Sequence, residues 1–382
     1  MTYPGPNGIR MLMIAVFYVD LPLIPRPNSE GEMHMSMTQV QTDAGDVLEA
    51  LNQISKGRMV MDWNEVASGA NPYVVMKNSN IPGKSVMEIP GLVFGDKRKP
   101  VSRIGVGMTL TESVIELASA MRLDLIVVHH PVADAASSGG VPFADYLPLY
   151  DLALIEMHEA FHGLHPGLTL LHGHRKLTTD TAFGGIPGNI LHKGIALEEV
   201  RTAGDILRRI DSFMGRELDR DILEAERAIR GEASLQEATL ANPARLLSGS
   251  PGHAVKHILH FFPHTGFTLE HLETALAMYP ETDTIIASIS RVREDHPFVG
   301  LAKRRGLNFI VGNPHSVEIM ENGLPLAYAL EMLLPQVEIF LLRERITAVP
   351  LNEVGHAQMV EYGKEMAAAH LVAKPSRAVQ ML

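Results

Sequence analysis

The sequence predicts an α/β protein of two lobes, in which helices flank mixed sheets. Short apolar runs of strand length alternate with segments of helical periodicity, as in strand–helix–strand units. Two series of such units are separated by a densely charged stretch, residues 196–230. The 382 residues are enough for two or three domains.

The first series opens with a helix expected over residues 42–51, capped by Thr42 or Asp43. The next stretch, residues 57–90, is expected to be irregular because Gly, Asn and Pro are scattered through it. A strand, a helix, a fully buried strand and a second helix follow, over residues 101–108, 112–121, 125–128 and 148–164. If the two strands share a sheet, we expect them to be parallel, with a right-handed crossover.

The second series follows a Gly-rich loop at residues 179–189 and the charged stretch, which is expected to be a solvated helix. Strands are expected at 255–262, 284–290, 308–311 and 337–342, and helices at 269–278, 297–305, 316–334 and 353–370. The predicted organisation is an N-terminal arm or extension, a first lobe, a second lobe and a return to the first lobe with a C-terminal helix. The corresponding ranges are 1–40, 41–175, 176–322 and 323–382.

Composition excludes several classes of function. The net charge is −11 and the pI is near 5.9, so no basic face for nucleic acid or anionic lipid is expected. The chain has no cysteine, so any metal must be held by His, Asp and Glu, and the 18 histidines supply many such side chains. The apolar run at residues 11–19 is too short to span a bilayer and makes a poor signal peptide. We therefore expect a cytoplasmic protein, and we place no function before residue 40.

The most informative segment is His129-His130-Pro131, which follows the buried strand expected at 125–128. Ligand sites in open α/β sheets lie beyond the carboxyl ends of strands. Adjacent residues of a strand point to opposite faces, so two adjacent histidines can serve one metal cluster only where the strand ends. A pair of hydrogen-bonded histidines without a ligand is the alternative.

Two further segments gain meaning beside the first. Thr179-Asp180 precedes the Gly184-Gly185 pair, and a carboxylate before a flexible loop can reach a neighbouring site. His315 and Glu318 are three residues apart at the start of an expected helix, where they share a face.

Taken together, these segments resemble the Nif-three-like family, whose members are often described as GTP cyclohydrolase I type 2 homologues. The match includes Gly91-Leu-Val-Phe-Gly95 for the family's Gly-Leu-x-x-Gly and His129-His130-Pro131 for its His-His-Pro. It also includes Thr179–Gly185 for the loop after its His-Thr-Asn-Leu-Asp motif, and Glu318 for the Glu of its Gly-His-x-x-x-Glu motif. The resemblance extends over residues 41–345.

The resemblance implies a metal site in the cleft between the two lobes, with two divalent ions (Zn, Mn, Fe or Ni). The expected ligands are His129, His130, Asp180, His315 and Glu318, where His315 substitutes for the family histidine whose position is Pro314 here. Glu318 and Asp180 are also expected to act in catalysis, together with a cleft histidine, His174 or His296. The motif histidine four residues before the Asp is Lys176 here, so His174 or His172 is its nearest substitute.

A second motif competes with this interpretation. His158-Glu159-Ala-Phe-His162 is an H-E-x-x-H sequence, which on a helix places two histidines on one face beside a glutamate, as in zinc peptidases. The zinc would then lie at His158 and His162, far in sequence from His129. The same segment is also compatible with an ordinary helix face near the mouth of the site, or with a histidine that contacts substrate.

The expected function is therefore a metal-dependent hydrolase acting on a small molecule. The reaction expected from the resemblance is cleavage of a C–N bond, in an amide, cyclic amide or heterocycle, by a hydroxide bridging two divalent metals. A non-enzymatic metal-binding scaffold or regulatory protein is the second hypothesis, and the metallopeptidase is the third. The family forms ring-like homohexamers, so a homo-oligomer is expected.

Overall fold

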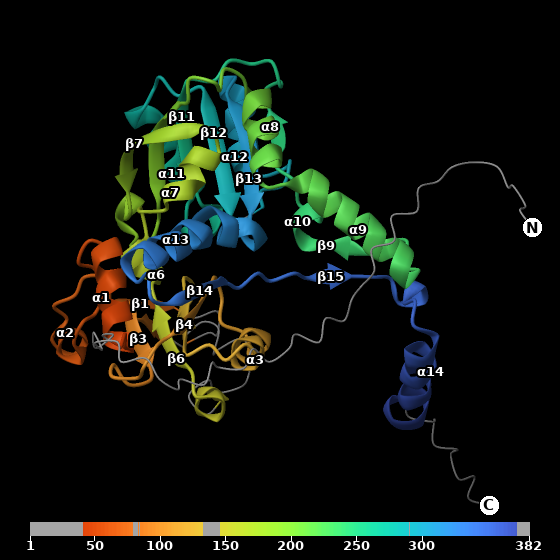
Figure 1. Cartoon of the computed structure of the whole chain (residues 1–382). Coiled ribbons are helices and arrows are strands. Elements are labelled where there is room, and N and C mark those ends of the chain that lie inside the picture. The colour runs from red at the N-terminus through yellow and green to blue at the C-terminus, as the bar shows by residue number, and fades with distance from the viewer. Residues whose placement is uncertain (1–40, 79–82, 84, 133–145, 290, 373–382) are drawn as a thin grey trace, which may run out of the picture. The chain divides into compact units, whose positions relative to one another are not determined.

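The computed structural model describes residues 41–78, 83, 85–132, 146–289 and 291–372 (Figure 1). The expected N-terminal arm, residues 1–40, lies outside the described residues. No helix among the described residues is long and apolar enough to cross a membrane.

A five-stranded sheet forms the first lobe, in the order β14–β4–β5–β6–β3. Neighbouring strands are parallel except for β3, which is antiparallel to β6. The predicted parallel pairing of the first two strands is confirmed, and Figure 1 shows the C-terminal strand β14, in blue, within this orange and yellow lobe. The strands are β3 (Gly91–Phe94), β4 (Arg103–Gly107), β5 (Leu125–Val128), β6 (Ala153–Glu156) and β14 (Glu338–Leu341).

Helices cover both faces of this sheet because its strands are apolar on both sides. In β5, Leu125 and Val127 pack into one core while Ile126 and Val128 pack into the other, as the period of two requires. The first core is covered by α1 (Ala44–Ile54) and α13 (Leu324–Leu333), and the second by α3 (Glu112–Ala120) and the short η1 (Leu147–Tyr150).

A six-stranded mixed sheet forms the second lobe, in the order β10–β13–β12–β11–β8–β7. The three strands β11, β12 and β13 are parallel, and β10, β8 and β7 pair antiparallel with their neighbours. The strands are β7 (His174–Asp180), β8 (Leu191–Ala196), β10 (Arg245–Ser248), β11 (His257–Phe261), β12 (Thr284–Ile289) and β13 (Asn308–Pro314). Its helices are α8 (Ala203–Phe213), α11 (Leu269–Met278) and α12 (Pro297–Arg305).

The remaining elements are short, except for two exposed helices. Two small sheets pair β1 (Val75–Asn78) with β2 (Ser85–Glu88) and β15 (Thr347–Ala348) with β9 (Gln236–Glu237). The longer helices are α9 (Arg216–Arg230) and α14 (Ala357–Met366). The shorter helices are α2 (Trp63–Ser68), α6 (His158–Phe161), α7 (Pro166–Leu171), α10 (Ala238–Ala241), η2 (Phe183–Gly185), η3 (Pro263–Thr265), η4 (His315–Val317), η5 (Ile319–Gly323), η6 (Leu351–Glu353) and η7 (Ala367–Leu371).

Three expectations about local structure are corrected. The helix expected over 148–164 is instead the buried strand β6 followed by α6, because Ala-Leu-Ile-Glu is covered on both faces of the sheet. The irregular stretch over 57–90 contains the hairpin of β1 and β2, whose alternation in β2 is only four residues long. The charged stretch is two helices, because Gly215 adopts a left-handed conformation between them.

Candidate metal centre

Two neighbouring strands of the first sheet deliver histidines to one edge. His129 and His130 directly follow β5, and the segment His158–His162 begins two residues after β6. The backbone stays in register there, since the His129 amide donates to the Gly107 carbonyl at 3.2 Å and Met157 to Val128 at 3.0 Å. Because β5 and β6 are parallel, their carboxyl ends meet at the same edge, which is where ligands bind in such sheets.

The second lobe supplies a carboxylate to this edge. Glu318 and His315 follow β13, and Glu318 is almost fully buried. Its Oε2 lies 3.2 Å from His130 Nε2 and 3.0 Å from His315 Nε2, while its Oε1 lies 3.5 Å from His129 Nε2. The structure thus brings together four of the five predicted ligands, from two different sheets.

The closest contact in this group is between two ring nitrogens. His130 Nε2 and His315 Nε2 are 2.8 Å apart, and both face the same oxygen of Glu318. At most one of the two nitrogens can donate a proton to the other. Neighbouring ligands of one octahedral or tetrahedral zinc ion stand roughly 2.8–3.4 Å apart, given Zn–N bonds of about 2.0–2.1 Å. The arrangement is therefore compatible with a cation between these side chains.

A second set of ligand atoms shares His129. Nitrogens of His129, His158 and His162 lie within 4.8 Å of one another, as do ligand atoms of His129, His130 and Glu318. The ring centroids of His158 and His162 are 4.3 Å apart, and that of His158 is 5.4 Å from His129. We call His129, His130, His158, His162, His315 and Glu318 the edge cluster.

Unpaired buried nitrogens at the edge cluster fit a bound cation. His129 Nδ1 is buried and has no hydrogen-bond partner among the described residues, and both ring nitrogens of the neighbouring His165 are in the same state. The His165 ring lies 5.4 Å from His129 and 5.8 Å from His162. Buried polar atoms are rarely left unpaired, so these rings fit a site completed by a metal ion.

Electrostatics keep several of these rings neutral. Burial lowers the pKa of His129 and His158 well below the usual range, and it lowers the pKa of His165 to about 3. Burial alone would raise the pKa of Glu318, but hydrogen bonds from His130 and His315 outweigh it and hold that pKa well below its usual range. Neutral imidazoles beside an ionised carboxylate are the donor set that divalent transition metals take.

Asp180 is not brought to the edge cluster. It ends β7 at one margin of the second sheet, is exposed, and accepts a hydrogen bond from the Ala182 amide at 2.9 Å. The pairing runs from Asp180 through β8, β11 and β12 to Val311 of β13, which is roughly 19 Å of sheet at about 4.8 Å per strand. Asp180 instead lines a hollow of about 380 Å³ with Lys193 and Tyr279.

The two expected cleft histidines also lie elsewhere. His296 caps α12, where its Nδ1 accepts a hydrogen bond from the Phe298 amide at 3.2 Å. His174 begins β7 and its Nε2 lies 3.0 Å from Nδ1 of His260. Neither belongs to the two sets of ligand atoms named above or to the third set found among the described residues, which is Glu88, His158 and Glu159.

His174 belongs to a different group of histidines, inside the second lobe. His172 and His174 have ring centroids 4.8 and 5.2 Å from that of His260, and His192 lies 6.2 Å from it. All four side chains are fully buried. We call these four residues the inner cluster.

Two residues beside the edge cluster had no signal in the sequence. Lys77 and Glu88 come from the β1–β2 hairpin, within the stretch expected to be irregular, and both contact the H-E-x-x-H segment. The motif itself is not a continuous helix, because α6 ends at Phe161 and His162 has an extended ψ of 133°. Glu159 forms an ion pair with Lys77 and a 3.1 Å hydrogen bond with Nδ1 of His162.

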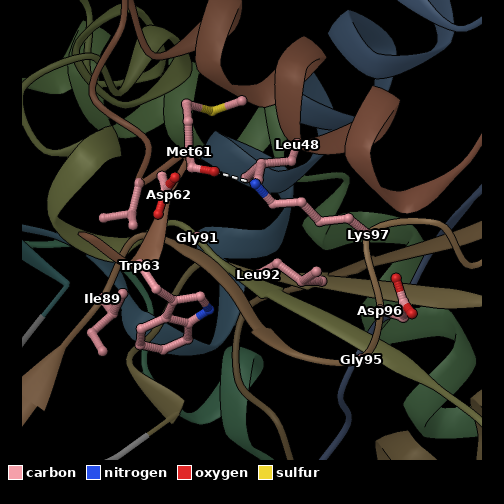
Figure 2. A pocket seen from close by; sticks show the side chains of 11 residues that line it. Leu48, Met61, Asp62, Trp63, Ile89, Gly91, Leu92, Gly95, Asp96 and Lys97 are labelled. Atoms are coloured by element: carbon pink, nitrogen blue, oxygen red, sulfur yellow. Dashed lines mark hydrogen bonds between the residues drawn. The ribbon is translucent and has the colours of Figure 1, made fainter. Parts of the chain in front are cut away.

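A hollow of about 450 Å³ is lined by residues outside the edge cluster (Figure 2). Trp63 and Leu92 line it, and Lys97 donates a hydrogen bond to the Met61 carbonyl across it. None of the edge-cluster residues lines this hollow. A substrate cleft at the edge cluster therefore stays a prediction.

Comparisons with known proteins agree with the motif resemblance. Residues 79–136, which include the His-His-Pro segment, match the model of the Duf34/NIF3 (NGG1p interacting factor 3) family. This match supports a distant relationship of the chain to the Nif3-like family. A search of curated proteins found no match.

Solved structures similar to this chain share little sequence with it. A Bacillus cereus protein related to NIF3 is 12% identical, with 80% of this chain and 97% of that chain covered and a TM-score of 0.49. The hypothetical protein SA1388 of Staphylococcus aureus is 14% identical, with 79% and 96% covered and a TM-score of 0.48. Reduced HcgD from Methanocaldococcus jannaschii is 16% identical, with 74% and 99% covered and a TM-score of 0.46.

Two segments of the chain resemble parts of the family's His-Thr-Asn-Leu-Asp motif. Thr179–Gly185 shares the Asp and the Gly pair, whereas His158–His162 shares the opening His and a potential ligand four residues later. Only the second segment lies at the edge cluster. The geometry therefore brings His162, and not Asp180, to the edge cluster.

Proposed function

We propose that this protein is a metal-dependent hydrolase that cleaves a C–N bond of a small molecule at the edge cluster. The observation that carries the proposal is the meeting of neutral histidines from β5 and β6 with the ionised Glu318 from the other lobe. His130, His315 and Glu318 would hold one divalent ion, and His158 and His162 a second, with His129 between them. The ions would supply Lewis-acid activation of water and of the substrate.

The protein's own groups define how substrate would approach. His315 is half exposed, and the His264 ring lies 5.6 Å from it, so these two histidines face the open side of the cluster. Desolvation and the neighbouring His315 lower the pKa of His264 to about 4, so this ring is uncharged at neutral pH. Thr109 holds His130 from behind, with its hydroxyl 2.6 Å from Nδ1. The choice of a C–N bond follows from the family's description as cyclohydrolase homologues.

The peptidase hypothesis has less support. A helical H-E-x-x-H motif keeps its glutamate beside the metal-facing nitrogens as a general base. Here Glu159 faces the Nδ1 side of His162 and is paired with Lys77. A metal-binding scaffold without enzymatic activity remains the second candidate, because it needs only the donor set.

Metal content measured by mass spectrometry tests the proposal. We would load wild type, His129→Gln, His158→Gln and His174→Gln with Zn²⁺, Mn²⁺, Fe²⁺ or Ni²⁺ and then remove free metal. Wild type and the inner-cluster variant His174→Gln should retain metal, and the two edge-cluster variants should lose it. A loaded wild type should then hydrolyse at least one member of a panel of amides, lactams and nucleotides.

Each other outcome contradicts a definite part of the proposal. Metal retained equally by all four proteins would place the ions outside the edge cluster. Metal binding without hydrolysis across the panel, under every metal, would favour the scaffold.

A further inference from the structure

We propose that Glu88 and Glu159, joined by Lys77, form an acidic clamp that fixes the rings of His158 and His162 by their Nδ1 atoms. The clamp rests on the metal centre proposed above and assigns it positioning residues. Glu88 and Lys77 lie outside every motif of the sequence, and Glu159 would act here in a role different from that of a peptidase base.

The first part of the clamp is a pair of carboxylate–histidine hydrogen bonds. His158 Nδ1 lies 2.6 Å from Glu88 Oε2, and His162 Nδ1 lies 3.1 Å from Glu159 Oε2. Both carboxylates are buried, so their oxygens have little access to water. With Nδ1 donating to a carboxylate, Nε2 is the nitrogen that each ring has left for a metal. Such pairing fixes the tautomer and orientation of a metal ligand and raises its basicity.

The second part is the lysine that joins the carboxylates. Lys77 Nζ lies 3.0 Å from Glu88 Oε2 and also forms an ion pair with Glu159. Two buried carboxylates side by side would repel each other, and a shared ammonium group offsets that repulsion. One cation therefore holds both acids in the positions from which they reach the two histidines.

The hairpin geometry explains why Lys77 and Glu88 act together. In the β1–β2 pair, Val75 is opposite Glu88 and Lys77 is opposite Val86. Lys77 is two residues from Val75, so it shares a face with Glu88 on the diagonal, within reach of long side chains. Val86 and Glu88 are the buried residues of β2, which identifies that face as the inner one. The hairpin thus presents one acid and the shared cation to the edge cluster, and α6 presents the other acid.

Zn²⁺ affinity, measured by competition with a chromophoric chelator, tests the clamp. Glu88→Ala and Glu159→Ala should each weaken binding by about 10- to 100-fold, the usual cost of losing the outer partner of a metal-binding histidine. Glu88→Gln and Glu159→Gln keep an acceptor oxygen at nearly constant volume, so they should lose less than the alanine variants. The visible absorption of the Co²⁺-loaded alanine variants should also differ from that of wild type.

Lys77→Met and Glu338→Ala complete the experiment. Lys77→Met as a single substitution should weaken Zn²⁺ binding. Added to Glu88→Ala, it should reduce the Zn²⁺ affinity by a smaller factor, because the lysine acts through the acids it joins. Glu338 is exposed and pairs with Arg103 on the same lobe, so Glu338→Ala should bind Zn²⁺ as wild type does. Thermal unfolding of the metal-free proteins identifies any variant that fails to fold, and the glutamine variants then carry the test.

Two results would overturn the clamp, and they are distinguishable. Wild-type binding of Zn²⁺ with unchanged affinity and Co²⁺ spectra in both alanine variants would overturn the clamp alone. A wild type that binds neither ion would overturn the metal centre, and the clamp with it.

Discussion

The edge cluster and the inner cluster are both groups of buried histidines, yet their rings have different partners. In the edge cluster, carboxylates of Glu88, Glu159 and Glu318 lie within hydrogen-bond distance of the rings. In the inner cluster, His260 bonds to His174 and to the Ser288 hydroxyl, and His192 bonds to the Thr179 hydroxyl. His172 donates to the Leu168 carbonyl at 2.8 Å and accepts from the Asn313 amide at 3.1 Å.

The partners of the rings distinguish a metal site from a packed core, whereas the number of histidines does not. Burial lowers the pKa of rings in both clusters, so neutrality alone does not distinguish a ligand from a core residue. A metal ligand needs one nitrogen directed at the ion and the other held by an acceptor. Unpaired nitrogens occur in both clusters, at Nδ1 of His129 and at Nδ1 of His174 and Nε2 of His192, within the described part of the chain. Carboxylates within hydrogen-bond distance of several rings are what sets the edge cluster apart. We therefore expect the edge cluster to govern metal binding and the inner cluster to govern stability.

The effect that separates the two clusters most directly is stabilisation by metal. Zn²⁺ at 100 times its dissociation constant should raise the unfolding free energy of wild type by about 2.7 kcal/mol. His129→Gln should abolish this increase, because His129 belongs to both sets of ligand atoms at the edge. His174→Gln should keep it. Thermal unfolding with Zn²⁺ and with EDTA measures both, and a Zn²⁺ effect lost only in His174→Gln would reverse the assignment of the two clusters.

A core substitution in the inner cluster should cost stability without affecting metal. His260→Ala leaves a cavity and removes the partner of His174 and Ser288, so it should lower the unfolding free energy by about 2–4 kcal/mol. His315→Ala, at a half-exposed edge position, should cost less than about 1 kcal/mol. Urea denaturation of the metal-free proteins compares them. Equal costs would show that the edge is packed as a core as well.

Glu321 is the one carboxylate found beside the inner cluster among the described residues, and its protonation can be tested. Burial raises its pKa to about 8, and its Oε1 accepts a hydrogen bond from Asn313 and lies 3.8 Å from Nδ1 of His172. Its contribution to stability is present below the unfolded pKa near 4.5 and is lost as the pH rises through about 8. Glu321→Gln should therefore be more stable than wild type by about 2 kcal/mol at pH 8.5, and the gain should shrink at pH 5. Urea unfolding midpoints of wild type and Glu321→Gln at the two pH values measure this gain in stability. A gain that does not depend on pH would argue against a protonated Glu321.

A further effect is the acid sensitivity of individual inner histidines. Burial lowers the pKa of His172 to about 4 and that of His174 to about 3. Their contribution is present above the unfolded pKa near 6.5 and is lost as the pH falls toward those values. Each should add up to about 1.4 kcal/mol per pH unit to the loss of stability below about pH 6.5. His174→Gln should reduce this slope in metal-free protein; an unchanged slope would mean that His174 is already protonated when folded.

The parts of the site that could be predicted from the sequence directly follow continuous apolar runs that the sequence identifies as buried strands. The buried run before His129 determined the strand and hence the edge at which the two histidines lie, and Glu318 was placed by the short strand before it. Asp180 was misplaced relative to the cluster because a Gly-Gly loop is common to many turns, and only the strand order shows its distance from β13. Lys77 and Glu88 had no signal because their contacts depend on a hairpin of two four-residue strands packing against a segment some 70 residues later.

The first lobe takes its last strand and one of its covering helices from the part of the sequence that follows the second lobe. Buried residues of α13, among them Leu326 and Leu330, lie in the same core as Val47 and Leu51 of α1, and β14 pairs with β4 along one margin of the sheet. During synthesis, the ribosome must therefore release the chain through Leu341 before that margin is covered. Until then β4 presents unpaired backbone groups, which are open to pairing with another chain. The last strand of the second sheet ends at Pro314, so the second lobe can complete its sheet before β14 has been synthesised. The first lobe begins earlier in the chain but completes its sheet later.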